Sequence, residues 1–207
     1  INPNNPTGAL YSNETLEQIA ELARKHHLVV CADEIYDRIL YDGEVHTPFA
    51  KLAPDLPCLT FNGLSKAYRL AGFRSGWMIV SGPRFISRDF IEGINILSTM
   101  RLCANVPAQY AIQTALGGYQ SINDLVLPTG RLGAQRNLAH KLLSEIPGVT
   151  CFKPKGAIYL FPKIDTNMYD IGDDEQFALN LLIEKKLLIV QGTAFNLNEN
   201  VYMRLVF

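Results

Sequence analysis

The stretch Leu28-Val29-Val30-Cys31-Ala32 is a short, continuous apolar run that is followed at once by Asp33-Glu34-Ile35-Tyr36. Such a run predicts a strand that is buried on both faces. Residues 58–61 (CLTF) and 76–80 (GWMIV) have the same character and predict two further strands. Strands separated by connecting segments in this order favour an α/β fold with a mostly parallel sheet.

Helical periodicity surrounds these strands. Ser12 or Asn13 is placed to cap a helix that runs to about His26, and further helical patterns cover residues 84–98, 107–119 and 124–143. Pro128 and Gly130 indicate that the last of these begins late or is kinked. A smaller α+β unit is expected after a boundary near residues 120–130. Its predicted strands are 149–152, 157–161, 187–190 and 201–207, and its predicted helix is 174–185.

Composition excludes several classes of function. Hydrophobic residues make up 48% and charged residues 19%, so the chain can form a core. A net charge of -1 argues against a nucleic-acid-binding protein or a face for anionic membranes. No apolar run approaches the roughly 18 residues of a membrane span. The four cysteines and four histidines have no metal-ligand spacing, so we expect no metal site and mostly buried free thiols.

Polar residues follow two of the predicted strands. Asp33 comes directly after the first strand, and Lys66 comes a few residues after the second. Ligands of open α/β sheets bind beyond the carboxyl ends of the strands. Taken alone, an aspartate here is more often a turn or cap residue and a lysine is usually solvated. The ordered set of motifs to which they belong carries more weight.

Asn5-Pro6-Thr7-Gly8, the ADEIY motif at 32–36, Ser65-Lys66 and Arg74 occur in this order and at this spacing. In these motifs the whole chain resembles the C-terminal half of the fold-type-I aminotransferases of class I/II, which use pyridoxal 5'-phosphate (PLP). The sequences at 100–121 (MRLCANVPAQYAIQTALGGYQS) and 188–196 (LIVQGTAFN) are most similar to bacterial glutamate–pyruvate (alanine-forming) aminotransferases.

The resemblance implies a fold and a domain division. Residues 1–125 are expected to be the C-terminal part of the PLP-binding large domain, with three layers around a mostly parallel sheet. Residues 126–207 are expected to form a small, truncated α+β C-terminal domain. The chain begins in a turn-rich stretch and stops in an apolar run, so we expect it to be a piece of a longer protein.

The resemblance also implies roles for the residues of the cofactor site. Lys66 would carry PLP as a Schiff base and, once released by the substrate, shuttle a proton between the substrate α-carbon and C4' of the cofactor. Asp33 would partner the pyridinium nitrogen and keep the ring an electron sink. Tyr36 and Asn5 would hydrogen-bond the phenolic oxygen of the cofactor.

Two arginines are expected to bind anions. Arg74 fits the cofactor phosphate, because a guanidinium can bind phosphate through two parallel hydrogen bonds, and Ser65 would add a hydroxyl. Arg204, between apolar neighbours, matches the arginine that holds the substrate α-carboxylate, with Asn5 beside it in the same role. An edge-strand arginine that faces solvent is the alternative for Arg204.

The activity implied is a ping-pong transfer of an amino group between an L-amino acid and a 2-oxo acid. The leading pairs are alanine/pyruvate and glutamate/2-oxoglutarate. A PLP-dependent C–S β-lyase and the aminotransferase-like sensor module of a transcription regulator remain alternatives. We expect a cytoplasmic enzyme whose full-length form is a homodimer, with no nucleic-acid or membrane partner. The 207-residue piece alone is expected to bind PLP poorly.

Overall fold

The computed structural model describes residues 1–198 and 201–207, with all side chains of these except those of Arg84 and Ile86. The chain divides into two compact units. Unit 1 contains residues 1–3, 11–38 and 45–123, and unit 2 contains residues 4–10, 39–44 and 124–207. The assignment of 1–125 and 126–207 to the two domains of the family stays a prediction. The contacts add that two short segments from the first part of the chain belong to unit 2.

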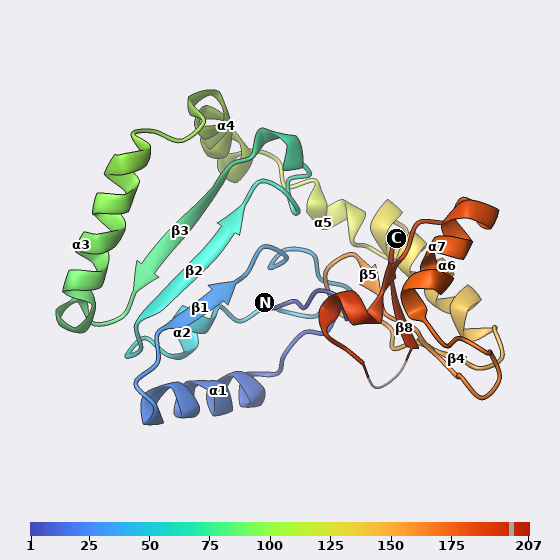
Figure 1. The fold of residues 1–207 in the computed structure, drawn as a ribbon. Helices are drawn as coiled ribbons and strands as arrows, with labels where there is room; N and C mark the ends of the chain where they lie inside the picture. Colours follow the sequence, from blue (N-terminus) through green and yellow to red (C-terminus); the bar gives the residue numbers. More distant parts are fainter. Residues whose placement is uncertain (199–200) are drawn as a thin grey trace. The chain divides into compact units, whose positions relative to one another are not determined.

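Unit 1 is built on a three-stranded sheet in the order β1-β2-β3 (Figure 1). β1 (Val30–Asp33) and β2 (Cys58–Gly63) are parallel, whereas β3 (Gly76–Ser81) runs antiparallel to β2. The α/β fold is as expected, but the parallel arrangement covers only the first pair. The link between β2 and β3 holds no helix longer than the three-residue η1 (Ala71–Phe73), so it returns the chain without a crossover.

The first helix follows its sequence signals. α1 (Asn13–Lys25) begins after Ser12, whose hydroxyl accepts a hydrogen bond from the Thr15 N–H at 3.2 Å. Such a cap typically contributes about 1 kcal/mol. The buried face of α1, with Leu16, Ala20 and Ala23, packs in one cluster with Phe49 of α2 (Phe49–Leu52). The predicted helix from residue 12 or 13 to about 26 is confirmed.

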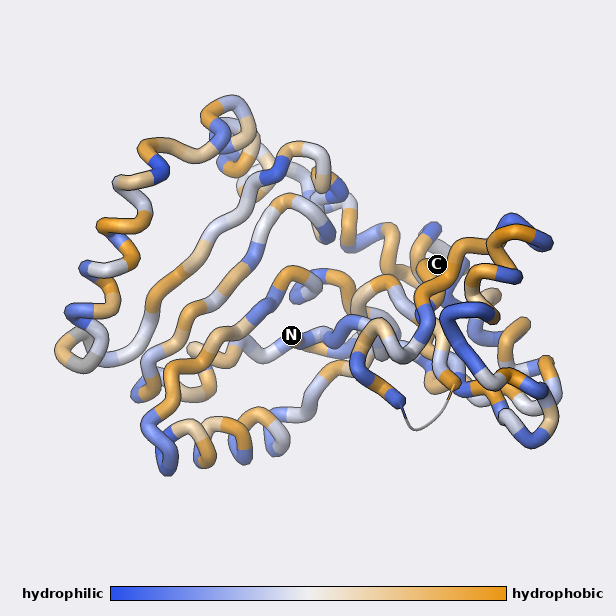
Figure 2. The backbone as a smooth tube through the Cα atoms, in the orientation of Figure 1, coloured by the Kyte–Doolittle hydropathy of each residue, from blue (hydrophilic) through white to orange (hydrophobic). Residues whose placement is uncertain are grey.

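The remaining helices of unit 1 are α3 (Arg84–Arg101) and α4 (Val106–Gly117). Both confirm predicted helices. Apolar positions recur along α3 and into the segment that follows it (Figure 2), and Phe85, Leu97, Met100 and Leu102 are largely exposed. Among the described residues, no helix combines the length and the apolar character that crossing a membrane requires.

Two burial predictions for unit 1 are wrong. Residues 28, 29 and 31 are exposed, although the run 28–32 was expected to be buried on both faces. Leu28 and Val29 precede β1, which begins only at Val30, and β1 is an edge strand that leaves part of its surface uncovered. For the same reason the thiol of Cys31 is exposed. Cys103 is exposed as well, and Cys58 is the one fully buried member of the four free cysteines.

Unit 2 is organised around β8 (Val201–Val206), which pairs antiparallel with three short strands. These are β5 (Tyr159–Leu160), β6 (Lys163–Ile164) and β7 (Val190–Gln191), and β4 (Val149–Thr150) extends the sheet beyond β6. The predicted strands at 149–152, 157–161 and 201–207 are confirmed in shortened form, whereas the strand predicted at 187–190 is displaced, since β7 shares only Val190 with it. The two-residue β6 gave no sequence signal because it is too short to show alternation.

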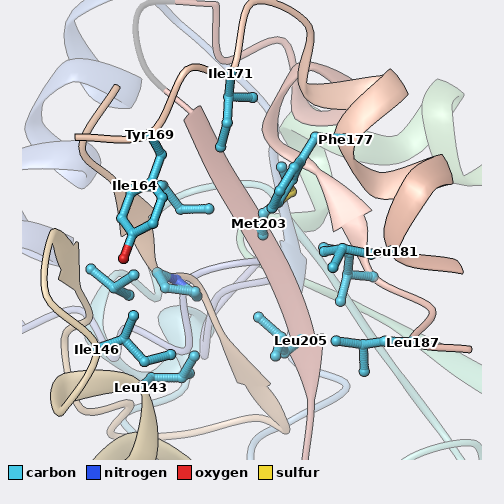
Figure 3. A pocket seen from close by; sticks show the side chains of 13 residues that line it. Leu143, Ile146, Ile164, Tyr169, Ile171, Phe177, Leu181, Leu187, Met203 and Leu205 are labelled. Atoms are coloured by element: carbon cyan, nitrogen blue, oxygen red, sulfur yellow. The ribbon is translucent and has the colours of Figure 1, made fainter. Parts of the chain in front are cut away.

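The helices of unit 2 are α5 (Ile122–Leu125), which begins just before the unit does, α6 (Arg131–Ser144) and α7 (Asp174–Lys185). As expected from Gly130, which is its N-cap, α6 begins only at residue 131. η2 (Gly192–Phe195) follows β7. The core cluster of this unit contains Ala178, Ile189, Val201 and Met203. Beside it lies a cavity of about 220 Å³ with apolar walls, to which Leu143, Phe177, Leu181 and Leu205 contribute (Figure 3).

A buried arginine holds the segment 39–44 within unit 2. Arg136 of α6 is only 1% exposed and donates hydrogen bonds to the Pro154 carbonyl at 3.1 Å and to the Asp42 carboxylate at 2.8 Å. Its guanidinium carbon lies 4.4 Å from the centroid of the Tyr41 ring. The hydrogen bond from Arg136 holds the pKa of the Asp42 carboxyl below its usual value. The Tyr41 hydroxyl in turn donates to the Ala157 carbonyl at 2.8 Å.

Replacing Arg136 with Ala should therefore destabilise unit 2. The change leaves a cavity and an unpaired Pro154 carbonyl, which together should lower the free energy of unfolding by about 2–4 kcal/mol. Lys141→Ala on the same helix is the control. Its side chain is 71% exposed and 3.8 Å from Glu145, so we expect a change below about 0.5 kcal/mol. Urea unfolding followed by circular dichroism measures both, and equal stability of the two variants would contradict this role.

Candidate active site

Asp33 is the last residue of β1, opposite Phe61 of β2. Its side chain is half-buried, and its Oδ1 accepts a hydrogen bond from the Ile35 N–H at 3.2 Å. Its carbonyl accepts from the Asn2 N–H at 3.0 Å, which fixes the end of the strand. Within the described residues no basic side chain forms a salt bridge with Asp33. The carboxylate is therefore available to a cationic partner at the carboxyl end of the strand.

Lys66 lies just beyond the end of β2, in the link to β3. Because β1 and β2 are parallel, their carboxyl ends meet at one edge of the sheet, so Asp33 and Lys66 are both at this edge. The Lys66 Nζ is 5.7 Å from the centroid of the Tyr36 ring, which is 2% exposed. In the described part of the chain, no acid forms a salt bridge with Lys66. The structure thus brings the predicted lysine and tyrosine together, with the amine not held by a carboxylate.

The link of residues 64–75 is closed at its base by a glycine pair. Gly63 and Gly76 face each other across β2 and β3, and a Cβ on Gly76 would lie 2.7 Å from the Asn62 carbonyl oxygen. Above this pair, the Leu64 N–H donates to the Ser75 carbonyl at 3.0 Å. A side chain at either glycine would push β2 and β3 apart. The glycine pair therefore allows the two ends of the link, next to Gly63 and Gly76, to lie close together.

Ser65 and Arg74 belong to the same link. Arg74 has a left-handed conformation, with φ 51°, at the end of η1, and its Nη1 donates to the Ala71 carbonyl at 2.8 Å. Its side chain is exposed and Ser65 is half-buried. No hydrogen bond joins Arg74 to Ser65 or Lys66 among the described residues. The guanidinium therefore keeps most of its donors for an external anion.

Two residues that sequence reasoning did not single out connect this site. The Asn62 side-chain amide donates to the Glu34 carbonyl at 3.1 Å, and its oxygen accepts from the Gly63 N–H at 2.7 Å. Buried Glu34 accepts from the Phe49 N–H at 2.9 Å, and burial raises the pKa of its carboxyl. Asn62 thereby joins the turn after Asp33 to the strand before Lys66. An asparagine at a strand end resembles an ordinary turn former, so no sequence signal identifies it.

Arg204 and Asn5 form a separate group within unit 2. The Arg204 Nη1 donates to the Asn5 Oδ1 at 3.0 Å. The guanidinium carbon is 4.8 Å from the centroid of the Tyr159 ring and 5.1 Å from that of Phe195. The Arg204 Nε is buried without a hydrogen-bond partner, and the residues that the structure describes offer it no acid. A guanidinium held by aromatic rings with an unpaired donor is suited to binding a carboxylate.

No group of three or more His, Cys, Asp or Glu side chains that could hold a metal ion occurs in the described residues. The chemical groups present are instead an unpaired amine beside a buried phenol, a carboxylate at the same sheet edge, and two arginines with free donors. The groups of unit 1 are of the kind that binds an anionic, aromatic cofactor, and Arg204 of unit 2 is of the kind that binds a carboxylate.

Comparison with known proteins agrees with the motifs. Residues 1–207 match the family described as aminotransferase class I and II. Alanine aminotransferase from Mycobacterium tuberculosis (strain ATCC 25618 / H37Rv) is 61% identical over 206 residues, which are 100% of this chain and 48% of that protein. Glutamate-pyruvate aminotransferase AlaA from Haemophilus influenzae is 59% identical, with 100% of this chain and 51% of that protein covered.

Solved structures give the same result for the fold. An aminotransferase from Escherichia coli superimposes with a TM-score of 0.96 at 58% identity, covering 99% of this chain and 51% of that one. Alanine aminotransferase from Pyrococcus furiosus has a TM-score of 0.87 at 37% identity, covering 99% and 51%. The chain spans about half the length of the curated relatives it matches. Over all of its residues, the chain belongs to the family of class I and II aminotransferases.

Proposed function

We propose that this chain is part of a PLP-dependent aminotransferase that moves an amino group between an L-amino acid and a 2-oxo acid. The alanine/pyruvate and glutamate/2-oxoglutarate pairs are the substrates that we assign. The observation that carries the proposal is the position of Lys66, beside Tyr36 and at the same sheet edge as Asp33. The names of the relatives, alanine and glutamate-pyruvate aminotransferase, support the choice of substrates.

The residues present fit PLP. When bound, PLP supplies an electron sink for the negative charge that develops at the substrate α-carbon. Lys66 would hold the cofactor covalently, since its amine has no carboxylate partner among the described residues. Asp33 would hold the proton of the pyridinium nitrogen, and Arg74 and Ser65 would bind the phosphate. Each of these groups keeps hydrogen-bonding capacity that the described chain does not use.

The proton transfer and the substrate contacts follow from the same residues. We assign the transfer of a proton between the substrate α-carbon and C4' of the cofactor to the freed Lys66 amine. Tyr36 and Asn5 would hydrogen-bond the cofactor's phenolic oxygen. Arg204, with the Asn5 amide beside it, would bind the substrate α-carboxylate, where its unpaired Nε supports the assignment.

The proposal also covers the oligomeric state of the full-length enzyme and its cellular compartment. The enzyme would act as a homodimer in the cytoplasm. The exposed apolar residues Phe85, Leu97, Met100 and Leu102 support burial of α3 and the segment after it against further protein. Four free cysteines support a reducing compartment.

L-Alanine added alone to the intact PLP-loaded enzyme should complete one half of the reaction. We expect the absorbance of the lysine-bound cofactor to fall while one equivalent of pyruvate forms, and 2-oxoglutarate to restore that absorbance. A C–S β-lyase would instead release pyruvate, ammonia and a thiol from a cysteine thioether without consuming 2-oxoglutarate. An unchanged spectrum in alanine would count against the proposed activity.

Asp33→Ala should slow proton removal and spare cofactor attachment. Without the carboxylate the pyridine ring loses its proton and withdraws electrons less well, so we expect the single-turnover rate to fall by about 10²- to 10³-fold. Asp37→Ala, in the turn that follows β1, is the matched control and should keep nearly the normal rate. Stopped-flow absorbance with L-alanine measures both. A normal rate in Asp33→Ala would remove Asp33 from the mechanism.

A further inference from the structure

Arg204 is held by more than its own strand, because η2 and the aspartate Asp174 of α7 support it as well. We propose that Asp174 and Thr193 are positioning residues that fix η2, and through Phe195 the guanidinium of Arg204, for binding the substrate carboxylate. This inference rests on the proposed role of Arg204. It assigns to a buried aspartate and a threonine a function in substrate affinity.

Asp174 anchors η2 at two points. Its Oδ1 accepts a hydrogen bond from the Thr193 hydroxyl at 2.8 Å, and its Oδ2 accepts from the Thr193 N–H at 3.0 Å. Asp174 is only 7% exposed. Both oxygens of a buried carboxylate are therefore used on a single residue of η2. A charge-assisted pair of this kind restrains geometry more than a neutral hydrogen bond does.

Capping of α7 does not explain this aspartate. The N-cap is the preceding Asp173, whose Oδ1 accepts from the N–H groups of Glu175 at 2.9 Å and Gln176 at 3.1 Å. The helix end is thus already satisfied by its neighbour. The carboxylate of Asp174 instead accepts hydrogen bonds from Thr193 of η2. The buried position of Asp174 therefore serves to hold η2 and is not needed to cap the helix.

η2 carries Phe195 to the guanidinium. The Phe195 ring centroid lies 5.1 Å from the Arg204 guanidinium carbon, and the Tyr159 ring is 4.8 Å from the same carbon. The Phe195 ring also meets the Phe161 ring edge-on at 5.9 Å. Phe161 in turn stacks on Tyr202 of β8 at 5.0 Å, with 14° between the ring planes. Phe195 is therefore held both by the Thr193 anchor and by the Phe161 ring, which stacks on Tyr202 of β8.

The start of η2 lies tightly against β8. A Cβ at Gly192 would be 3.0 Å from the Tyr202 carbonyl oxygen and 3.1 Å from the Tyr202 Cβ. η2 therefore has little room to move while the anchor holds. Without the anchor, η2 and Phe195 gain freedom, and Arg204 must be ordered each time a carboxylate binds. The expected consequence is weaker substrate binding with unchanged chemistry once the substrate is bound.

The direct test is Thr193→Val in the intact enzyme. Valine keeps the shape of the side chain and the backbone N–H but removes the hydroxyl that donates a hydrogen bond to Asp174. We expect the dissociation constant for L-alanine in the half-reaction to rise by about 3- to 10-fold, less than the full effect of a lost hydrogen bond to a charged group, because Thr193 acts on the substrate only through Phe195 and Arg204. The rate at saturation and the absorbance spectrum of the bound cofactor should change little. Thr193→Ser keeps the hydroxyl and should retain normal affinity.

Two further measurements separate positioning from general damage. Ethylamine reacts through its amine but has no carboxylate for Arg204, so Thr193→Val should leave its binding unchanged. Calorimetry with propionate, which has a carboxylate but no amine, should show the same loss of affinity as alanine without any turnover. Asp174→Asn should reproduce the effect with a second variant.

The outcomes distinguish the two proposals. Normal alanine and propionate affinity in both Thr193→Val and Asp174→Asn would overturn the positioning role, as would an equal loss for ethylamine. If the parent enzyme binds propionate but transaminates no amino acid, the proposed activity is wrong, and a loss of propionate binding in the variants would still support the anchor.

Discussion

The parallel pairing of β1 with β2 is the constraint on which the candidate cofactor site depends. Its register sets Asp33 opposite Phe61, and the Glu34 N–H continues the pairing to the Phe61 carbonyl at 2.9 Å. Since parallel strands end at the same edge, this register places both Asp33 and Lys66, five residues after Phe61, at that edge. β1 has only four residues, so few backbone hydrogen bonds secure it. The Asn62 side chain adds a hydrogen bond from β2 to the Glu34 carbonyl, directly after β1.

The two faces of β8 have different roles. Successive side chains of a strand point to opposite faces. Val201 and Met203 face the core of unit 2, whereas Tyr202 and Arg204 lie on the alternate face, with the aromatic rings and Asn5. One strand therefore secures the fold with one face and presents the guanidinium with the other. A shift of register by one residue would bury Arg204 in an apolar core, which carries a large cost for an unpaired charge.

Much of this arrangement could be predicted from local sequence, and the remainder depends on distant contacts. The cap at Ser12 and the limits of α7 followed from capping residues and periodicity. Exposure of Cys31 did not, because a sequence does not state which strand is at the edge. Segments 4–10 and 39–44 join unit 2 through long-range contacts that no local pattern encodes. Thr193 resembles any loop threonine until Asp174 is found beside it.

The proposed function depends on the attachment of PLP to Lys66, and covalent mapping tests this attachment most directly. Borohydride reduction of the intact PLP-loaded enzyme would fix the cofactor on its lysine, and peptide mass spectrometry would locate it. We expect the pyridoxyl group on Lys66 alone, with exposed lysines such as Lys51 unmodified. A pyridoxyl group on another lysine, or a reduced enzyme with none, would contradict the proposed attachment.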